Sequence, residues 1–321
     1  MSSLDLAPAE QLATTTAMAT EITVRAVGGR ARDRSGAVDD ALGVFADVEA
    51  SCTRFDPASS LMGANARPDE WHRVAPRCFD ALGEAWRAYR TTAGRFDPRV
   101  LADLVVLGYD RTLAFGHGGE DVSAGTDAPR RRLARPPWRP RFRRATNEVH
   151  LGGAAVDLGG IGKGLAIRWA GDVLRAAGPD YLVNAGGDCY CGGRAPDGRP
   201  WRVGVEDPAG GTEPVVVVSL SDQASATSSV RVRRWRVAGV PVHHLIDPRS
   251  GLPGGDGLAA VTVVAPDPAD AEVWSKVLFL AGRSGVATEA SRRSLAACWV
   301  TVDGIVDLSP AMQPFVTWRR P

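Results

Sequence analysis

The residues best suited to chemistry begin with the stretch DLGGIGKG, residues 157–164. Its glycines allow positive φ angles and a close approach of the backbone to a ligand. The mostly apolar run 150–156 before it predicts a strand, and the amphipathic run 164–178 after it predicts a helix. A helix that begins at such a turn points free N–H groups and the positive end of its dipole at a bound anion. Lys163 adds a cation there, and Lys163 and Lys276 are the only two lysines among 38 basic residues.

A second candidate site is the stretch VHHLIDPRSGLP, residues 242–253. His243 and His244 are adjacent, so in a strand one side chain can face a ligand while the other packs. The Asp-Pro-Arg-Ser-Gly run that starts at Asp247 is a strong turn signature. A turn alone does not explain the nearby His and Arg249. Their combination is typical of an anion or phosphate site with a titratable group.

A third candidate is a pair of charges on a predicted helix, residues 269–282. Glu272 and Lys276 are four residues apart and therefore share one helical face. One interpretation is a surface ion pair, worth about 0.3 kcal/mol. The other is a face that looks into a cleft, with Glu272 as an oxygen ligand for a divalent ion and Lys276 as a phosphate contact. The scarcity of lysine favours the second.

A fourth candidate is the stretch GRFDPRVL, residues 94–101. Asp97 precedes a proline, and this pair predicts a turn at a helix start. A carboxylate at that position caps free N–H groups, which explains Asp97 without any ligand. Contact with a ligand is the alternative.

The elements that must position these residues are read from hydrophobic periodicity. Apolar residues at helical spacing predict helices over 37–50 and 78–92, and alternation predicts strands over 19–27, 201–208, 214–222, 224–230 and 258–268. Apolar Leu182 and Val183 indicate a buried strand, and Asn184 to Asp188 a second glycine turn that can lie beside the first. The later strands predict a largely antiparallel sheet.

Two segments carry no clear period. Residues 1–17 are polar and rich in Ala and Thr, and we expect a loose tail there. Residues 112–146 are rich in Gly, Pro and Arg, which predicts an exposed, partly disordered insertion. A solvated loop is favoured over a nucleic-acid-binding arm, because the stretch lacks the spaced aromatic residues of a stacking platform.

Composition narrows the class of protein. A chain of 321 residues with 44% hydrophobic and 23% charged residues is typical of a soluble globular protein. The formal net charge of +1 gives no drive toward nucleic acid, and no apolar run is long enough to cross a bilayer. The start lacks a secretory pattern, and the five cysteines form no disulfide framework, so we expect a cytoplasmic protein.

Taken together, the motifs resemble one family, the FAD:protein FMN transferases. The matching stretches keep the family's order: MAT (18–20), SCTRFDPASSL (51–61), GRFDP (94–98), DLGGIGKG (157–164), NAGGD (184–188), ATSS (226–229), HLIDPRSG (244–251) and VTVVAP to AEVWSKVLFLAG (261–282). Each glycine motif is weak evidence alone, but their joint order is specific. The resemblance covers the chain from about residue 18 onward.

The resemblance implies one α+β domain over 18–321, with mixed and antiparallel sheets flanked by helices and two coupled lobes around a central flavin cleft. It also implies transfer of the FMN half of FAD to a Thr or Ser hydroxyl of an acceptor flavoprotein, with Mg²⁺ and release of AMP. FAD is then the substrate and an acceptor protein the partner, and neither nucleic acid nor a membrane segment is expected.

Site roles are carried over position by position. His244 matches the catalytic base, and Asp247 is expected to orient either this histidine or the metal. The FAD site is assigned to Met18, Arg95, Phe96, Asp97, Lys163, Arg249 and Lys276. Gly160, through its carbonyl, and Glu272 are the metal ligands. The family commonly has Asp and, four residues later, Thr where this chain has Glu272 and Lys276, and Lys cannot ligate a metal because it is only a donor.

Three alternatives remain open from the sequence. The same cleft could direct water at FAD, which would make the protein a pyrophosphatase that releases FMN and AMP. The altered metal ligands also leave room for a non-catalytic FAD-binding protein. An Arg-rich nucleic-acid-binding module is the third alternative.

Overall fold

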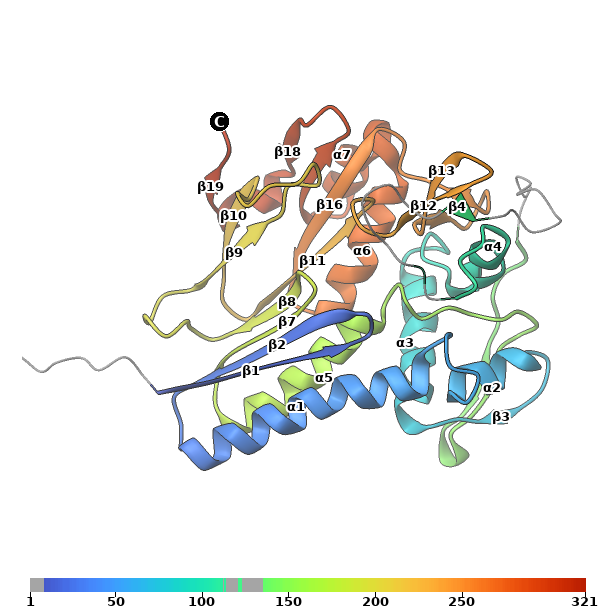
Figure 1. Cartoon of the computed structure of the whole chain (residues 1–321), viewed down its shortest axis with the longest axis horizontal. Helices are drawn as coiled ribbons and strands as arrows, with labels where there is room; N and C mark the ends of the chain where they lie inside the picture. The colour runs from blue at the N-terminus through green and yellow to red at the C-terminus, as the bar shows by residue number, and fades with distance from the viewer. Residues whose placement is uncertain (1–8, 112, 114–120, 123–134) are drawn as a thin grey trace, which may run out of the picture.

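A sheet of eight strands forms the framework of the computed structural model, which describes residues 9–111, 113, 121–122 and 135–321 (Figure 1). Its strand order is β1-β2-β7-β8-β11-β16-β17-β18, and each neighbouring pair is antiparallel. The bounds are β1 (Glu10–Ala17), β2 (Thr20–Val27), β7 (Asp180–Ala185), β8 (Asp188–Gly192), β11 (Gln223–Ser229), β16 (Leu258–Ala265), β17 (Ala296–Thr301) and β18 (Val306–Leu308).

Three helices cover one face of this sheet: α1 (Ala31–Cys52), α5 (Gly162–Ala177) and α6 (Pro268–Leu280). Helix α1 packs on β1 and β2, α5 on β7 and β8, and α6 on β11 and β16 (Figure 1). In α5, Leu165, Ala166, Ala170 and Leu174 are buried, which is the amphipathic spacing that the sequence shows. The predicted helices in these regions are therefore confirmed.

A smaller sheet, ordered β19-β10-β9, lies against the other face. It consists of β9 (Trp201–Val205), β10 (Val216–Leu220) and β19 (Val316–Arg319). Cys189, Cys191 and Cys298 of the large sheet share a buried cluster with Trp201 and Val216. These thiols act as small apolar side chains between two packed sheets.

The remaining elements lie outside these two sheets. The helices are α2 (Ser60–Ala66), α3 (Pro76–Thr91), η1 (Pro98–Val100), α4 (Leu101–Val106), η2 (Arg144–Thr146), α7 (Gly282–Arg292) and η3 (Pro310–Phe315). The short strands are β3 (His72–Arg73), β4 (Asp121–Val122), β5 (Arg141–Arg143), β6 (Glu148–His150), β12 (Arg234–Val237), β13 (Val240–His243), β14 (Ile246–Asp247) and β15 (Leu252–Pro253).

The predicted fold class is confirmed: α+β, with mixed and antiparallel sheets flanked by helices. The pair β4 and β12 is parallel, and it makes the set of sheets mixed. None of the helices that the structure describes combines the length and the apolar character that a membrane crossing requires.

The predicted loose tail over 1–17 is wrong for its second half. Residues 10–17 form β1, which pairs with β2 from Glu10 opposite Val27 to Ala17 opposite Thr20. The side chains of β1 are mostly exposed, so its sequence carries little of the hydrophobic pattern that marks a buried strand. Backbone hydrogen bonds to β2 hold the strand at the sheet edge, and its threonines favour the extended chain. Residues 1–8 lie outside the described residues.

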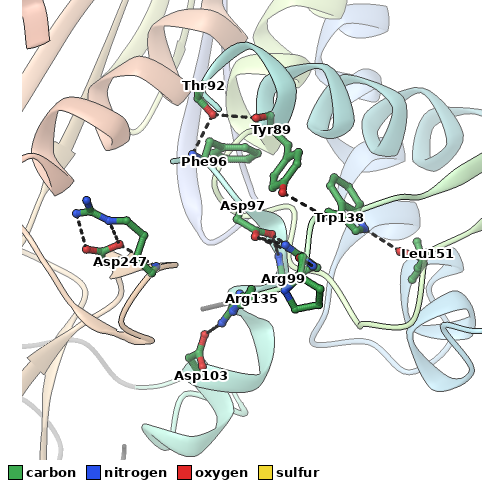
Figure 2. A network of polar contacts seen from close by, with 12 residues as sticks. Tyr89, Thr92, Phe96, Asp97, Arg99, Asp103, Arg135, Trp138, Leu151 and Asp247 are labelled. Carbon is green, nitrogen blue, oxygen red and sulfur yellow. Dashed lines mark hydrogen bonds and ion pairs between the residues drawn. The ribbon is translucent and has the colours of Figure 1, made fainter. Parts of the chain in front are cut away.

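The predicted exposed insertion over 112–146 is confirmed in part, because most of residues 135–146 are exposed but they include β5, η2 and one buried anchor. Trp138 is fully buried, its indole N–H donates to the carbonyl of Leu151 at 2.7 Å, and its backbone N–H donates to the Tyr89 hydroxyl at 3.1 Å (Figure 2). Arg135 pairs with the buried Asp103. One aromatic anchor therefore docks a segment whose composition resembles a loop. Residues 112, 114–120 and 123–134 lie outside the described residues.

The strand predicted over 150–156 is also wrong, because β6 ends at His150. The amide of Asn65 takes the place of a neighbouring strand: its Nδ2 donates to the Val156 carbonyl at 2.8 Å, and its Oδ1 accepts from the Val156 N–H at 2.9 Å. A buried side chain thus satisfies the backbone of an irregular segment.

Candidate functional site

A cavity of about 550 Å³ opens where these segments meet, a volume suited to a cofactor-sized ligand. Its walls come from parts of the chain as distant as Met18 and Leu280. Most of the residues predicted for the site line it: Met18, Arg95, Phe96, Asp97, Gly160, Lys163, His244 and Lys276. The structure does not place Asp247, Arg249 or Glu272 among its lining residues.

The glycine stretch forms one wall, and α5 begins inside it at Gly162, as predicted. Lys163 in the first turn forms an ion pair with Asp188, whose side chain is 4% exposed. Asp188 also accepts a hydrogen bond from the Thr227 N–H at 2.8 Å. Because Asp188 follows the second glycine turn, this ion pair brings the two glycine turns together, as the sequence predicted.

Helix α6 provides the second lysine. The Lys276 ammonium group lies 3.1 Å from Oε1 of Glu272, and Oε2 of Glu272 accepts from the Gly164 N–H at 2.8 Å. The Glu272 side chain is 1% exposed, so the interpretation as a surface ion pair is wrong. Glu272 caps the first turn of α5 from a neighbouring helix, and Lys276 reaches the cavity.

As predicted, one of the two adjacent histidines packs in the fold and the other faces the cavity. His243 packs edge-on against Phe279, with ring centroids 6.0 Å apart, while His244 lines the cavity. Nδ1 of His244 lies 3.2 Å from the Arg233 carbonyl oxygen, which can only accept. In the neutral ring the proton is therefore on Nδ1, and Nε2 keeps its lone pair.

Burial lowers the pKa of both imidazole rings. Desolvation and the cations Arg233 and Lys276 lower the pKa of His244 well below its usual value of 6.5. Desolvation lowers the pKa of His243 to about 4, against a hydrogen bond to the backbone of Gly254. Both imidazoles are therefore neutral at neutral pH, and Nε2 of His244 is ready to accept a proton.

Asp97 serves the fold in the way that its capping interpretation predicted. Its carboxylate accepts from the Arg99 N–H at 3.0 Å and caps η1, and it also binds the Arg99 guanidinium at 2.7 Å (Figure 2). Arg95 pairs with Glu289 at 2.7 Å and, with Arg292 and Arg293, holds the pKa of that carboxyl at about 2. Asp97 thus shapes the wall beside Phe96, and its oxygens already have partners.

Asp247 and Arg249 bind one another rather than His244. The Asp247 carboxylate accepts from the Arg249 N–H at 2.9 Å and pairs with its guanidinium at 2.8 Å (Figure 2). The Arg249 side chain is 72% exposed. The expectation that Asp247 orients the histidine is wrong in this structure, because the Arg233 carbonyl has that role.

Met18 reaches the cavity from the two-residue turn between β1 and β2. Met18 and Ala19 have φ angles of 53° and 56°, which suit such a hairpin turn but are unfavourable for residues other than glycine, Asn or Asp. The Met18 N–H donates to Oε1 of Glu49 at 2.8 Å. Backbone strain of this kind gathers at functional sites, so the position agrees with a ligand contact.

Arg54 is the main residue that the sequence interpretation missed. Its guanidinium lies between the rings of Phe55 and Tyr109, 4.2 and 4.3 Å from their centroids. It pairs with Asp157 at 2.9 Å, and its side chain is 5% exposed. Its buried Nη2 has no hydrogen-bond partner among the described residues, although Arg54 lines the cavity. The stretch SCTRFDPASSL signalled its importance without assigning it a role.

Comparisons with known proteins agree with one another. The model of the ApbE family matches residues 18–299. A protein named FAD:protein FMN transferase from Escherichia coli (strain K12) is 30% identical over 168 residues, which are 52% of this chain and 46% of that protein. The chain thus spans about half the length of this relative (46%).

Two solved structures share the fold. The apbe protein from Thermotoga maritima has a TM-score of 0.79 at 23% identity and covers 98% of this chain and 100% of its own. The flavin transferase ApbE from Vibrio cholerae has a TM-score of 0.76 at 21% identity and covers 96% of this chain and 99% of its own.

Proposed function

We propose that this chain, which belongs to the ApbE family, transfers the FMN half of FAD to a Thr or Ser hydroxyl of an acceptor protein. The name of its Escherichia coli relative, FAD:protein FMN transferase, supports this proposal. The observation that carries it is a cavity lined by a neutral imidazole with a free Nε2 and by the cations Lys163, Arg233 and Lys276.

In the proposed reaction the acceptor oxygen attacks the phosphorus on the riboflavin side of the FAD pyrophosphate. A bond forms between that oxygen and phosphorus, and the bond from phosphorus to the bridging oxygen breaks. AMP leaves with the bridging oxygen and the electron pair, and the hydroxyl proton passes to Nε2 of His244. Such a transfer depends on positioning and charge neutralisation.

Several cavity residues can provide this positioning and charge neutralisation. Lys163 stands at the N-terminus of α5, where the N–H groups and the helix dipole also favour a phosphate. Lys276 adds a second ammonium group to the lining of the cavity, and Arg233 adds a guanidinium. Phe96 and Met18 offer apolar surface for the flat flavin or adenine rings. Arg95 and Asp97 hold that wall in shape through their ion pairs.

The residues that the resemblance assigns to Mg²⁺ do not fit the ion in this fold. Both oxygens of Glu272 already have partners, the Gly164 N–H and the Lys276 ammonium group. No cluster of three His, Cys, Asp or Glu side chains suited to a metal occurs in the described ranges. The aliphatic stem of Lys276 also lies against Gly160. No step of the proposed mechanism is therefore assigned to the metal.

We also propose that the protein is located in the cytoplasm. All five cysteines are buried free thiols, which agrees with a reducing compartment. The acceptor is a protein that presents a Thr or Ser hydroxyl to the mouth of the cavity.

The proposal is tested with purified protein, FAD and a Thr-containing acceptor peptide, with and without MgCl₂. Flavin that stays on the peptide after denaturation identifies a transferase. Release of free FMN and AMP identifies a pyrophosphatase instead. Unchanged FAD that remains bound identifies a binding protein, and either of these two results contradicts the transferase proposal.

Replacement of His244 tests the base directly. In His244→Ala we expect transfer to fall by about 100-fold or more, because no other group is assigned to take the hydroxyl proton. FAD affinity measured by flavin fluorescence should stay within about threefold, since the loss is in chemistry rather than binding. Transfer at the wild-type rate would remove His244 from the mechanism.

A further inference from the structure

We infer that the Lys276 ammonium group occupies the position of a divalent cation in the cavity, so that this chain binds FAD and transfers FMN without a metal ion. The inference rests on the proposed function and specifies how that site neutralises the pyrophosphate.

The position of Lys276 is fixed by two contacts. Its ammonium group is 3.1 Å from Oε1 of Glu272, and its side chain is 17% exposed. A methyl group built on Gly160 would lie 3.4 Å from the Lys276 stem, so the stem runs along the glycine turn. The cation is therefore held where the turn and α6 meet, in the cavity that Lys163 and His244 also line.

Glu272 is poorly placed to hold a metal, because each of its two oxygens already faces a hydrogen-bond donor. A Mg²⁺ ion needs carboxylate or carbonyl oxygens at about 2.1 Å in octahedral geometry. Oε2 is bonded to the first turn of α5, and Oε1 faces the ammonium group. A metal ion on Oε1 would lie beside that ammonium group, and because the Glu272 side chain is only 1% exposed, water would screen the repulsion between the like charges poorly.

The second lysine shows the same arrangement. Lys163 pairs with buried Asp188, as Lys276 pairs with buried Glu272. These are the only lysines in a sequence that otherwise uses arginine for its basic residues. An ammonium group is a compact point charge with three donors, closer to a metal ion in shape than a planar guanidinium. The structure thus places two compact cations, each paired with a buried carboxylate, in the lining of the cavity.

The wild-type protein gives the first test. FAD affinity is measured by flavin fluorescence in EDTA and in excess MgCl₂, and Mg²⁺ binding without FAD is measured by calorimetry. We expect equal FAD affinity within about twofold and no saturable Mg²⁺ binding in the millimolar range. A loss of about tenfold or more in EDTA that Mg²⁺ restores would overturn the inference.

The transfer assay separates this inference from the proposed function. Equal rates in EDTA and in MgCl₂ support the inference. Transfer in MgCl₂ alone overturns it and leaves the proposed function intact. If no acceptor is flavinylated under either condition the proposed function fails, and the binding measurements still decide whether Lys276 replaces the metal.

Lys276→Thr supplies the complementary test, with folding verified by circular dichroism. Its shorter side chain frees Oε1 of Glu272 and adds a hydroxyl oxygen. We expect FAD affinity in EDTA to fall about tenfold or more and to recover in MgCl₂. Lys276→Met keeps the stem, and its thioether is a poor Mg²⁺ ligand, so its loss should persist in MgCl₂. Wild-type affinity of both variants in EDTA would overturn the inference.

Discussion

At the scale of single residues, Arg54 gives the clearest test of ligand contact. Its guanidinium binds the Asp157 carboxylate and the Tyr109 carbonyl. Its buried Nη2 has no hydrogen-bond partner among the described residues. A buried donor without a partner is costly, so we expect a ligand oxygen or nitrogen to accept from it. In Arg54→Lys the charge beside Asp157 remains and this donor is lost. FAD affinity should then fall about tenfold in a fluorescence titration.

The control for Arg54 is Arg67→Lys, because the Arg67 side chain is 67% exposed in its ion pair with Glu70. That variant should bind FAD like the wild type. Equal affinities for both variants would show that Nη2 of Arg54 does not contact the ligand.

His243 gives a pH dependence that belongs to stability rather than to catalysis. Its pKa falls from 6.5 in the unfolded chain to about 4 in the fold, so the unfolded chain binds more protons between these values. The stability contributed by the neutral ring is full above pH 6.5 and is lost as the pH falls toward 4. The loss amounts to about 3 kcal/mol at about 1.4 kcal/mol per pKa unit.

His243→Gln is the comparison, because glutamine can donate and accept but does not titrate. Urea unfolding at pH 7, 5.5 and 4.5 should show wild-type stability falling relative to the variant as the pH decreases. Parallel pH profiles for the two proteins would contradict the lowered pKa of His243.

At the scale of elements, the contact between α5 and α6 is set by Gly164. A methyl group there would lie 2.5 Å from the Pro268 carbonyl oxygen and 2.6 Å from Cα of Ala269. Gly164→Ala must therefore push the helices apart, which should cost about 2 kcal/mol in unfolding free energy. Because Lys163 and Lys276 lie on these two helices, FAD binding should weaken as well.

Gly171→Ala in the same helix is the matched control. Its methyl group would meet Tyr181 at 3.4 Å, an ordinary contact, and alanine favours the helix by up to about 1 kcal/mol. This variant should be as stable as the wild type or more so in urea unfolding. If Gly164→Ala behaved like Gly171→Ala, the tight contact between the helices would be wrong.

These elements also show how far the sequence alone could go. Periodicity and glycine patterns located α1, α3, α5 and α6 and the strands β2, β7, β9, β10, β11 and β16, because each of these signals is local. Strand β1 was missed because its order comes from pairing with β2, and its mostly exposed face carries no hydrophobic pattern. The role of Arg54 was missed because Tyr109 and Asp157 join it only through the tertiary fold.

At the scale of the whole molecule, one buried cluster joins the regions on both sides of the cavity. It contains Ile22 and Val183 of the large sheet, Leu165 of α5, and Phe79 and Trp138 of the segments around α3. A ligand held by walls from Met18 to Leu280 should therefore stabilise both regions together. FAD at about 100 times its Kd should add about 2.7 kcal/mol to the free energy of unfolding.

Differential scanning calorimetry checks this coupling. We expect one transition without ligand and a shift of that whole transition to higher temperature with FAD, since the shared core leaves neither region able to unfold alone. AMP, which carries only one phosphate and no flavin, should give a smaller shift at the same concentration because it contacts fewer walls. Two transitions, only one of them moved by FAD, would mean that the cavity belongs to a separately folding lobe.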